Sequence, residues 1–280
     1  MDNKAELGEF LRSRRARLKP DEVGLPMYGE RRRVPGLRRE ELAQLAGLSV
    51  DYYVRFEQGR SDNVSDAIID AVASALRLDR AERTHLHNLA RGVRASTHRE
   101  PAQEVRPGLL RLLDAIKDTP AYIVGRRTDI LAWNPLFATL TVDLDALSAE
   151  ERNKAWLVFR NEDVRSRYVN WETKARDVVA YLRMDLGRHP GDPAFDALIS
   201  RLSAESPDFQ QLWADQEVRD KTHGAYHMRH PVAGEFTLAY ETLRLPDDPD
   251  QALITYTAEP GSPSEAALRL IAGAQSLTSH

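Results

Sequence analysis

The sequence predicts an α+β protein in two parts, an all-α N-terminal bundle and a C-terminal domain with an antiparallel sheet. Apolar residues recur at helical spacing over residues 1–90. A polar stretch with two prolines follows at 91–107, and apolar and polar residues alternate in the last third, as in half-buried strands. At 280 residues the chain has room for two domains of ~100–200 residues. We expect a first domain at 1–92, a linker at 93–106 and a second domain at 107–280.

The N-terminal part is expected to contain about five helices. The first ends before Pro20, and a loop rich in proline and glycine follows as far as Gly36. Glycines then end two of the helices, because glycine readily adopts the positive φ found after a helix. The expected helices cover 38–46, 49–58, a segment that starts at Ser65 and a segment that starts at Asp79.

The C-terminal part is expected to carry about five strands, two early and three late, with helices between them. This order is typical of an α+β domain. The expected strands are 121–125, 129–133, 225–230, 235–243 and 252–257. The expected helices are 109–116, a short one from Asn134, one amphipathic helix of about six turns over 164–186, two that follow Asp192 and Ser206, and one after Ser262.

The charge is polarised along the chain. Residues 1–100 hold 19 basic and 16 acidic side chains, whereas the remainder holds 20 and 27. Within 12–39 there are ten basic and three acidic residues, and such a local field attracts polyanions. The absence of cysteine excludes disulfides, thiolate nucleophiles and cysteine-based metal sites. We expect neither a signal peptide nor a membrane span.

Residues 41–59 have the pattern of a helix-turn-helix. Ala43 is small enough for two helices to cross closely, and Gly47 suits the turn. Tyr53 and Phe56 would bury one side of the second helix, leaving the other side free. A small helical bundle with a coincidental turn is the alternative, but the run Glu57-Gln58-Gly59-Arg60 and the flanking arginines argue against it. The stretch resembles the Cro/C1-type (XRE) helix-turn-helix family, which binds DNA.

That resemblance implies a role for each exposed position. Val50, Asp51 and Arg55 would face base edges, with Tyr52 at the rim and Ser49 capping the helix. Arg39, Gln58 and Arg60 would contact phosphates. Tyr53, Phe56 and Glu57 are assigned to structure.

Five further arginines have two interpretations. They either extend the phosphate footprint or form a solvated basic face. They are Arg14, Arg15, Arg31, Arg32 and Arg33.

The resemblance extends over most of the chain. The sequence is similar to the MmyB-like group of bacterial transcription regulators, which has a long arginine-rich loop before its second helix. The motifs that carry this similarity are 31–43, 51–53, 132–135, 171–172, 206–209, 229–231 and 257–262. The resemblance implies a PAS-like sensor fold in 107–280 and a small apolar ligand, for which a fatty acid is a candidate.

Six aromatic residues are candidates for the lining of a ligand pocket. Ordinary core is the alternative for each of them, because large aromatic side chains dominate cores as well as pockets. They are Trp133, Phe137, Trp171, Tyr181, Trp213 and Tyr240.

The sequence gives no positive support for a metal, a cofactor or catalysis. His223, His227 and His230 lie close together in the sequence, but a strand places His227 and His230 on opposite faces. No phosphate-binding loop, dinucleotide fingerprint or zinc-protease motif is present. We expect no metal site and no enzyme.

The expected function is a cytoplasmic, ligand-responsive transcription regulator. It would bind a pseudo-palindromic operator as a homodimer, with half-sites ~34 Å apart or a multiple of that spacing. Two alternatives stay open: a second domain that only dimerises or binds another protein, and an enzyme tethered to DNA.

Overall fold

The computed structural model describes residues 3–24, 36–61, 63–91, 103–219 and 222–278. The chain divides into two compact units. Unit 1 comprises Met1–Arg99, Arg183–Ile199 and Trp213–Arg219, and unit 2 comprises Glu100–Leu182, Ser200–Leu212 and Asp220–His280. Most of the expected linker and Arg31, Arg32 and Arg33 lie outside the described residues. The expected domain boundaries therefore stay a prediction.

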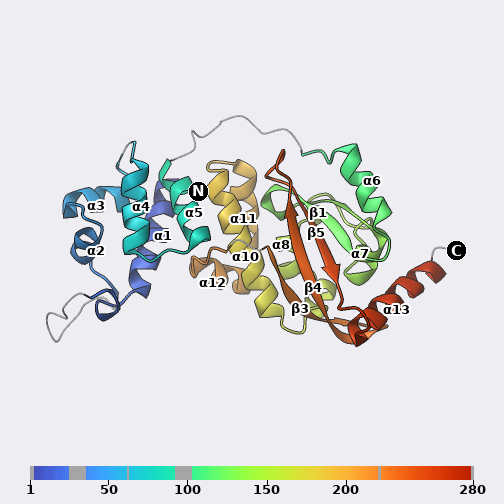
Figure 1. Ribbon diagram of the computed structural model, residues 1–280. Helices are drawn as coiled ribbons and strands as arrows, with labels where there is room; N and C mark the ends of the chain where they lie inside the picture. The colour runs from blue at the N-terminus through green and yellow to red at the C-terminus, as the bar shows by residue number, and fades with distance from the viewer. Residues whose placement is uncertain (1–2, 25–35, 62, 92–102, 220–221, 279–280) are drawn as a thin grey trace. The chain divides into compact units, whose positions relative to one another are not determined.

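Unit 1 is built on five helices of the N-terminal region, as expected (Figure 1). They surround a core that includes Phe10, Leu42 and Leu86, all fully buried. The helices are α1 (Asn3–Arg17), α2 (Arg39–Leu45), α3 (Val50–Glu57), α4 (Asp66–Ala75) and α5 (Arg80–Arg91), with a short 3₁₀ turn η1 (Asp21–Val23) after α1.

Two later segments belong to unit 1 as well. One includes the end of α10 (Trp171–Arg188) and the start of α11 (Pro193–Glu205), and the other is Trp213–Arg219. Met184 and Val218, exposed by 1% and 2%, join the same hydrophobic core as the five helices. No local pattern in the sequence predicts this addition, because the contacts span more than a hundred residues.

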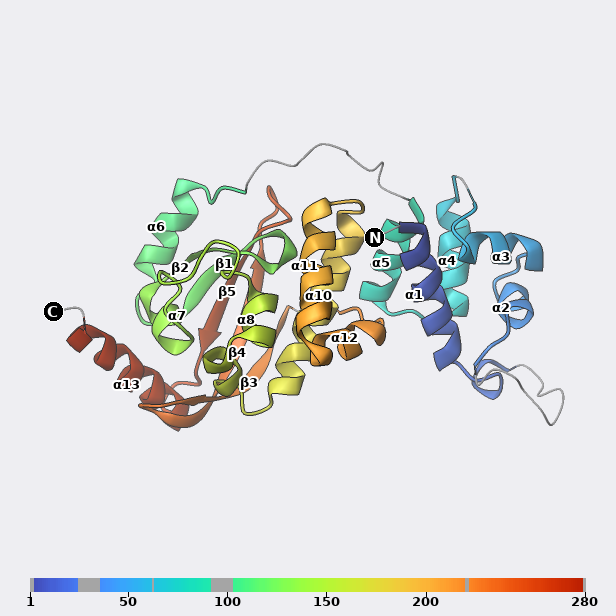
Figure 2. The same ribbon diagram turned by 180° about the vertical axis from the view of Figure 1, so that it is seen from behind.

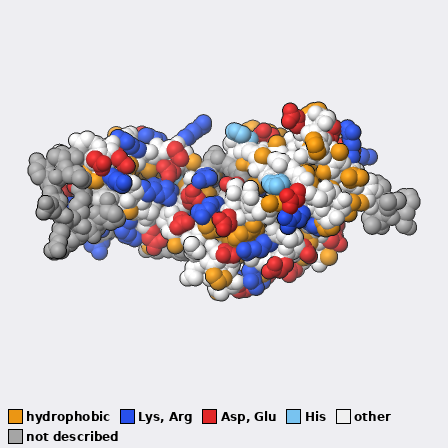
Figure 3. Space-filling view, turned by 90° about the horizontal axis from the view of Figure 1, so that it is seen from below, with side chains coloured by type: hydrophobic (Ala, Val, Ile, Leu, Met, Phe, Trp, Pro, Cys, Tyr) orange, Lys and Arg blue, Asp and Glu red, His pale blue; other side chains and the backbone are white. Residues whose placement is uncertain are grey.

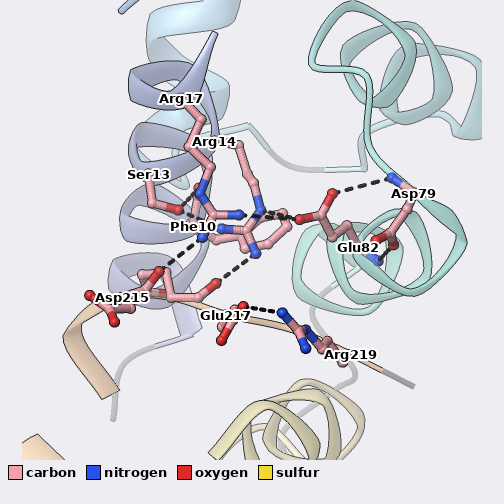
Figure 4. Close-up of polar contacts among 10 residues, drawn as sticks. Phe10, Ser13, Arg14, Arg17, Asp79, Glu82, Asp215, Glu217 and Arg219 are labelled. Atoms are coloured by element: carbon pink, nitrogen blue, oxygen red, sulfur yellow. Dashed lines mark hydrogen bonds and ion pairs between the residues drawn. The ribbon is translucent and has the colours of Figure 1, made fainter. Parts of the chain in front are cut away.

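Buried arginines tie these segments of unit 1 together, and Figure 4 shows the contacts of Arg14. Arg14 donates to the carbonyl of Gln216 at 2.6 Å and pairs with Glu82 at 2.8 Å. Arg183, which has no exposed surface, pairs with Glu6 and lies 3.9 Å from the centre of the Trp213 ring. Each of these buried arginines has an acidic partner, Glu6 buried and Glu82 half-buried, which offsets the cost of removing the arginine charge from water.

Unit 2 is organised around one five-stranded antiparallel sheet (Figures 1 and 2). Its order is β2-β1-β5-β4-β3, so the two early strands and the three late strands meet at the β1–β5 pair. This confirms the expected α+β class with about five strands. The strands are β1 (Ala121–Val124), β2 (Ile130–Trp133), β3 (His223–His230), β4 (Gly234–Arg244) and β5 (Ala252–Thr257), and the 3₁₀ turn η2 (Arg126–Thr128) joins the first two.

Helices cover both faces of the central strands. Ala121 and Ile123 point to one face, where α6 (Pro107–Ala115) packs through Leu109 and Leu113. Alternate residues point to the other face, which is covered by α7 (Pro135–Leu140), α8 (Lys154–Arg160) and α10. Unit 2 also contains α9 (Glu162–Ser166) and the part of α12 (Pro207–Ala214) up to Leu212. Helix α13 (Pro263–Thr278) packs on α7 and β4.

The expectation of a single helix over 164–186 was wrong. Two helices, α9 and α10, occupy the region and are separated at residues 167–170. The break has a physical cause, because the backbone there pairs with the edge of β3. Val169 donates to the carbonyl of His227 at 3.0 Å, and Arg229 donates to that of Arg167 at 2.8 Å. The apolar residues of α9 and α10 keep one helical spacing across the break, because the corresponding face of each helix is buried.

Asn134 is the polar joint between the first hairpin and α7. Its side chain is 2% exposed and makes four hydrogen bonds. Its Oδ1 accepts from the amides of Ala121 and Phe137, both at 3.0 Å. Its Nδ2 donates to the carbonyls of Ile116 and Thr119, both at 2.7 Å. Asn134 therefore caps α7 and at the same time fixes the chain that enters β1.

We predict that Asn134→Ala lowers the free energy of unfolding of unit 2 by about 3 kcal/mol, because buried backbone groups lose their partners. The control is Asn161→Ala, which removes a half-buried cap with one bond to the amide of Val164 at 2.9 Å, and which should cost about 1 kcal/mol. Urea unfolding followed by tryptophan fluorescence measures both. Equal losses in the two variants would contradict the role of Asn134 as a joint.

His85 is a buried neutral group in the core of unit 1. It has no exposed surface, and its ring contacts that of Phe10 edge-on at 5.0 Å between centroids. Within the described part of the chain its two ring nitrogens have no hydrogen-bond partner. Burial lowers the pKa of His85 to about 3, and the positive charges of Arg183 and Arg14 add to this shift.

The stability of unit 1 should consequently fall in mild acid. The unfolded chain takes up a proton at His85 near pH ~6.5, whereas the folded chain does so only near pH 3. Between pH 7 and pH 5, the wild type should lose about 2 kcal/mol relative to His85→Leu. Urea unfolding at the two pH values measures this difference. His223→Gln, at an exposed position, should follow the wild type; a pH-independent gap between wild type and His85→Leu would refute the argument.

Candidate functional site

The turn between α2 and α3 is built as the helix-turn-helix pattern predicts. Gly47 has a φ of +66°, and Ala43 is fully buried between the helices. The hydroxyl of Ser49 accepts a hydrogen bond from the amide of Tyr52 at 3.2 Å and so caps the start of α3. The N-terminus of α3 is thereby fixed without using any residue of its outer face.

The two faces of α3 differ sharply in exposure. Tyr53 and Phe56 are 0% and 1% exposed. Val50 is 40% exposed, and Asp51 and Arg55 are exposed as well. An apolar side chain, an acceptor and a donor are thus presented together on one short helix, which is the set of contacts that base edges in a major groove can use.

A buried carboxylate holds α3 in place. Glu57 has no exposed surface, and its Oε2 accepts from the hydroxyl of Tyr53 at 2.9 Å and from Nε of Arg15 at 3.2 Å. Its Oε1 accepts from Arg39 at 2.7 Å. Burial, together with the neighbouring Glu57 charge, raises the pKa of Tyr53 above its ordinary range, so its hydroxyl remains a donor. One side chain therefore links α1, α2 and α3.

This network changes the interpretation of several arginines. Arg14 is buried and Arg15 is 13% exposed, and both are paired with glutamates. The solvated basic face was therefore wrong for these two, and a phosphate contact of either stays a prediction. Arg39 is engaged by Glu57 and remains 42% exposed. Gln58 and Arg60 are exposed, after the end of α3. Basic and acidic side chains are interspersed on the face seen in Figure 3.

We predict that Glu57→Ala lowers the free energy of opening of α3 by about 3 kcal/mol, because Tyr53 and Arg15 are left without their buried acceptor. The control is Glu40→Ala, an exposed position on α2, which should change it by less than ~0.5 kcal/mol. Native-state amide hydrogen exchange of α3 measures the loss. An unchanged exchange rate in Glu57→Ala would show that the network does not hold the helix.

A second candidate site is a half-open cavity of about 60 Å³ in unit 2, between the sheet and the helices α8 and α10. Strand alternation explains its lining, since residues two apart on β1, β4 and β5 point to the same face. The strands and the turn after β1 supply Tyr122, Val124, Thr128, Tyr226, Tyr240, Thr242, Ile254 and Tyr256, and the helices supply Lys154, Lys174, Asp177, Val178 and Tyr181.

The lining is rich in hydroxyl groups. Burial raises the pKa of Tyr122 and Tyr256 well above the usual value, and it raises that of Tyr240 to about 12. These phenols therefore stay protonated at neutral pH and serve as donors. The hydroxyls of Tyr122, Tyr256 and Tyr168 are hydrogen-bonded in series. The cavity is thus apolar in its ring surfaces and polar at defined points, as ligand sites usually are.

The structure does not gather the six aromatic candidates into one site. Tyr181 and Tyr240 line the cavity, and Phe137 stacks behind its wall on Tyr122 at 4.3 Å. Trp133 lines a separate, more open pocket of about 740 Å³ that also contains Arg167. Trp171 packs edge-on against Phe159 and donates from Nε1 to the carbonyl of Val158 at 2.8 Å. Trp213 lies in unit 1.

Sequence reasoning missed the two lysines of the cavity. A signal for each exists. Lys154 directly precedes the largely apolar run Ala155–Phe159, and Lys174 lies four residues before Val178 and seven before Tyr181, which places the three on one side of a helix. Charged residues at such positions point to a buried role.

The histidines of β3 lie as strand alternation predicts. His230 is buried and bonded through Nε2 to the carbonyl of Thr139 at 3.1 Å. His227 points to the opposite face, where its Nε2 is 3.5 Å from Glu235. The two side chains do not converge.

Comparison with known families adds to this geometry. Residues 105–271, more than half of the chain, match the family model for the MmyB-like transcription regulator ligand binding domain. The chain belongs to this family. Residues 6–86 match a helix-turn-helix domain. No individual curated protein matches the chain.

As an MmyB-like regulator, the chain is a DNA-binding transcription regulator with a ligand-binding domain. The helix-turn-helix match contains the whole α2–turn–α3 segment and Glu57, and the ligand-binding match contains every residue that lines the cavity. Among the helices of the described residues, none is both long and apolar enough to cross a membrane.

Proposed function

We propose that the protein is a sequence-specific regulator that reads DNA with the outer face of α3 and changes its DNA binding when a small molecule occupies the unit 2 cavity. The observation that carries the proposal is the division of α3 into a side fixed by Glu57 and Tyr53 and a side that presents Val50, Asp51 and Arg55. A rigid helix with a free donor and acceptor face meets the requirement for direct readout.

The exposed residues have different tasks in this proposal. Arg55 would bond to a guanine through two donors, Asp51 would accept from cytosine and Val50 would contact a thymine methyl group. Tyr52 lies at the rim, with its ring 5.8 Å from the Arg55 guanidinium carbon. Gln58 and Arg60 would contact phosphate, and Arg39 would do so with the donors that Glu57 leaves free.

The rest of the proposal concerns symmetry and signal. Two copies would bind inverted half-sites in the cytoplasm, one helical turn or a multiple of it apart. A small apolar ligand, for which the family resemblance makes a fatty acid a candidate, can alter this binding only through unequal affinity for two arrangements of the protein. Selection of binding sites from random duplex DNA tests the reading function, and two inverted copies of one short sequence are expected. Failure to enrich any sequence would refute it.

Two substitutions separate reading from phosphate contact. Arg55→Ala should cost about 1–3 kcal/mol on the selected site and relax the preference at one base pair. Arg60→Ala should weaken binding to all duplexes alike and reduce the salt slope by about 1. Arg80→Ala, an exposed position at the start of α5, is the control and should change neither.

Fluorescence anisotropy at several salt concentrations measures both effects. If Arg55→Ala weakens specific and non-specific duplexes equally, α3 does not read sequence.

A further inference from the structure

The guanidinium group of Arg55 lies over the ring of a neighbouring residue on α3. Its central carbon is 5.8 Å from the centre of the Tyr52 ring, within the ~6 Å at which an arginine is attracted to an aromatic face. The two residues are three positions apart, so they share one side of the helix. Among the described residues, the Arg55 side chain has no hydrogen-bond or ion-pair partner. The Tyr52 ring is therefore the contact that can direct Arg55.

Tyr52 is itself held in place. Its side chain is half-buried and packs against the hydrophobic core of unit 1. Its amide donates to the hydroxyl of Ser49 at 3.2 Å, which fixes the backbone of the first turn of α3. An arginine side chain, by contrast, is long and has a large rotamer entropy when nothing restrains it. The structure thus combines a fixed ring with a flexible cation on one face of a short helix.

Arg55 has an alternative partner that it does not use. Asp51 lies four residues before it, and oppositely charged side chains at this spacing pair on the surface of a helix. Both side chains are exposed, and within the described part of the chain they form no ion pair with each other. Such a pair would occupy the donors and the acceptor that base edges require. The position of the guanidinium over the Tyr52 ring leaves both groups available.

We infer that Tyr52 is a positioning residue for DNA reading, whose ring holds the Arg55 guanidinium away from Asp51 and directs its N–H groups towards the bases. A guanidinium that lies on a ring keeps the donors around its edge, so contact with the ring and bidentate bonding to guanine are compatible. The inference rests on the proposed function and deepens it, because it explains how one helix presents a donor and an acceptor that do not neutralise each other.

The first test needs no DNA and uses the full-length protein. Protons over an aromatic face are shifted upfield in the NMR spectrum, and the Arg55 signals are identified by their loss in Arg55→Ala. Tyr52→Leu removes the ring but keeps an apolar side chain that suits a helix, whereas Tyr52→Phe keeps the ring face. We expect the side-chain CH₂ protons of Arg55 to lie upfield in the wild type and in Tyr52→Phe, and to move downfield in Tyr52→Leu. Identical positions in the wild type and Tyr52→Leu would overturn the inference.

The second test is DNA binding of the same variants, measured by fluorescence anisotropy on the selected duplex and on an unrelated one. Tyr52→Leu should weaken the selected duplex about three- to tenfold, because Arg55 is no longer directed, and should change the unrelated duplex by less than about twofold, because phosphate contacts remain. The preference should relax at two base pairs, those read by Arg55 and by Asp51. Tyr52→Phe should match the wild type. An equal loss in Tyr52→Phe would assign the effect to the hydroxyl group and overturn the inference.

A double variant shows whether Tyr52 acts through Arg55. In the Arg55→Ala background, Tyr52→Leu should weaken the selected duplex by less than about twofold, since residues that act together are not additive. A further loss as large as in the wild-type background would mean that Tyr52 contributes independently of Arg55, which contradicts a positioning role.

The melting temperature shows whether each variant folds. If Tyr52→Leu does not fold, Tyr52→Met, which also lacks the ring, takes its place in every comparison. Unchanged binding and base preference in the variant without the ring refute the positioning role alone, provided that the wild type reads DNA. A wild type that binds no duplex refutes the proposed function, and the inference with it.

Discussion

The buried carboxylate of Glu57 is the interaction on which the DNA-reading part of the molecule depends. A short helix of eight residues has little stability of its own. Glu57 ties the end of this helix to the helices before it through Arg15, Arg39 and Tyr53. Because the charge is fully enclosed, the position of α3 is specified by polar geometry as well as by apolar packing.

In unit 2 the corresponding constraint is the alternation of side chains along the central strands. One face of β1 packs on α6 through small and aliphatic residues, and the other presents Tyr122 and Val124 to the cavity. Alternate residues of this strand therefore have different roles: one set packs in the core, and the other set lines the cavity. Asn134 fixes the residue at which β1 begins. A single amide side chain therefore determines which residues of β1 face the cavity.

The sequence allowed most helices and all five strands to be predicted, because their periodicity, caps and glycines are local signals. The exposed and buried sides of α3 could be predicted for the same reason. The break at 167–170 could not be predicted, since it is caused by pairing with β3, some sixty residues away along the chain. Arg14 and Arg183 have partners still further away, 202 and 177 residues along the chain. Of the aromatic candidates, Tyr181 and Tyr240 line the cavity and Trp213 lies in unit 1. The sequence could not separate them, because large aromatic side chains fill cores as readily as they line pockets.

The break at 167–170 also affects how copies of the protein can associate. The outer edge of β3 would otherwise offer its free amides and carbonyls to any extended chain nearby. Residues 167 and 169 already occupy part of this edge. At the opposite end of the sheet, the amide of Ile130 on β2 donates to the carbonyl of Arg152. Both outermost strands are thus partly covered by the chain itself. Continuous sheets running from one copy into the next are disfavoured, which protects a concentrated regulator from aggregating through its own β-structure.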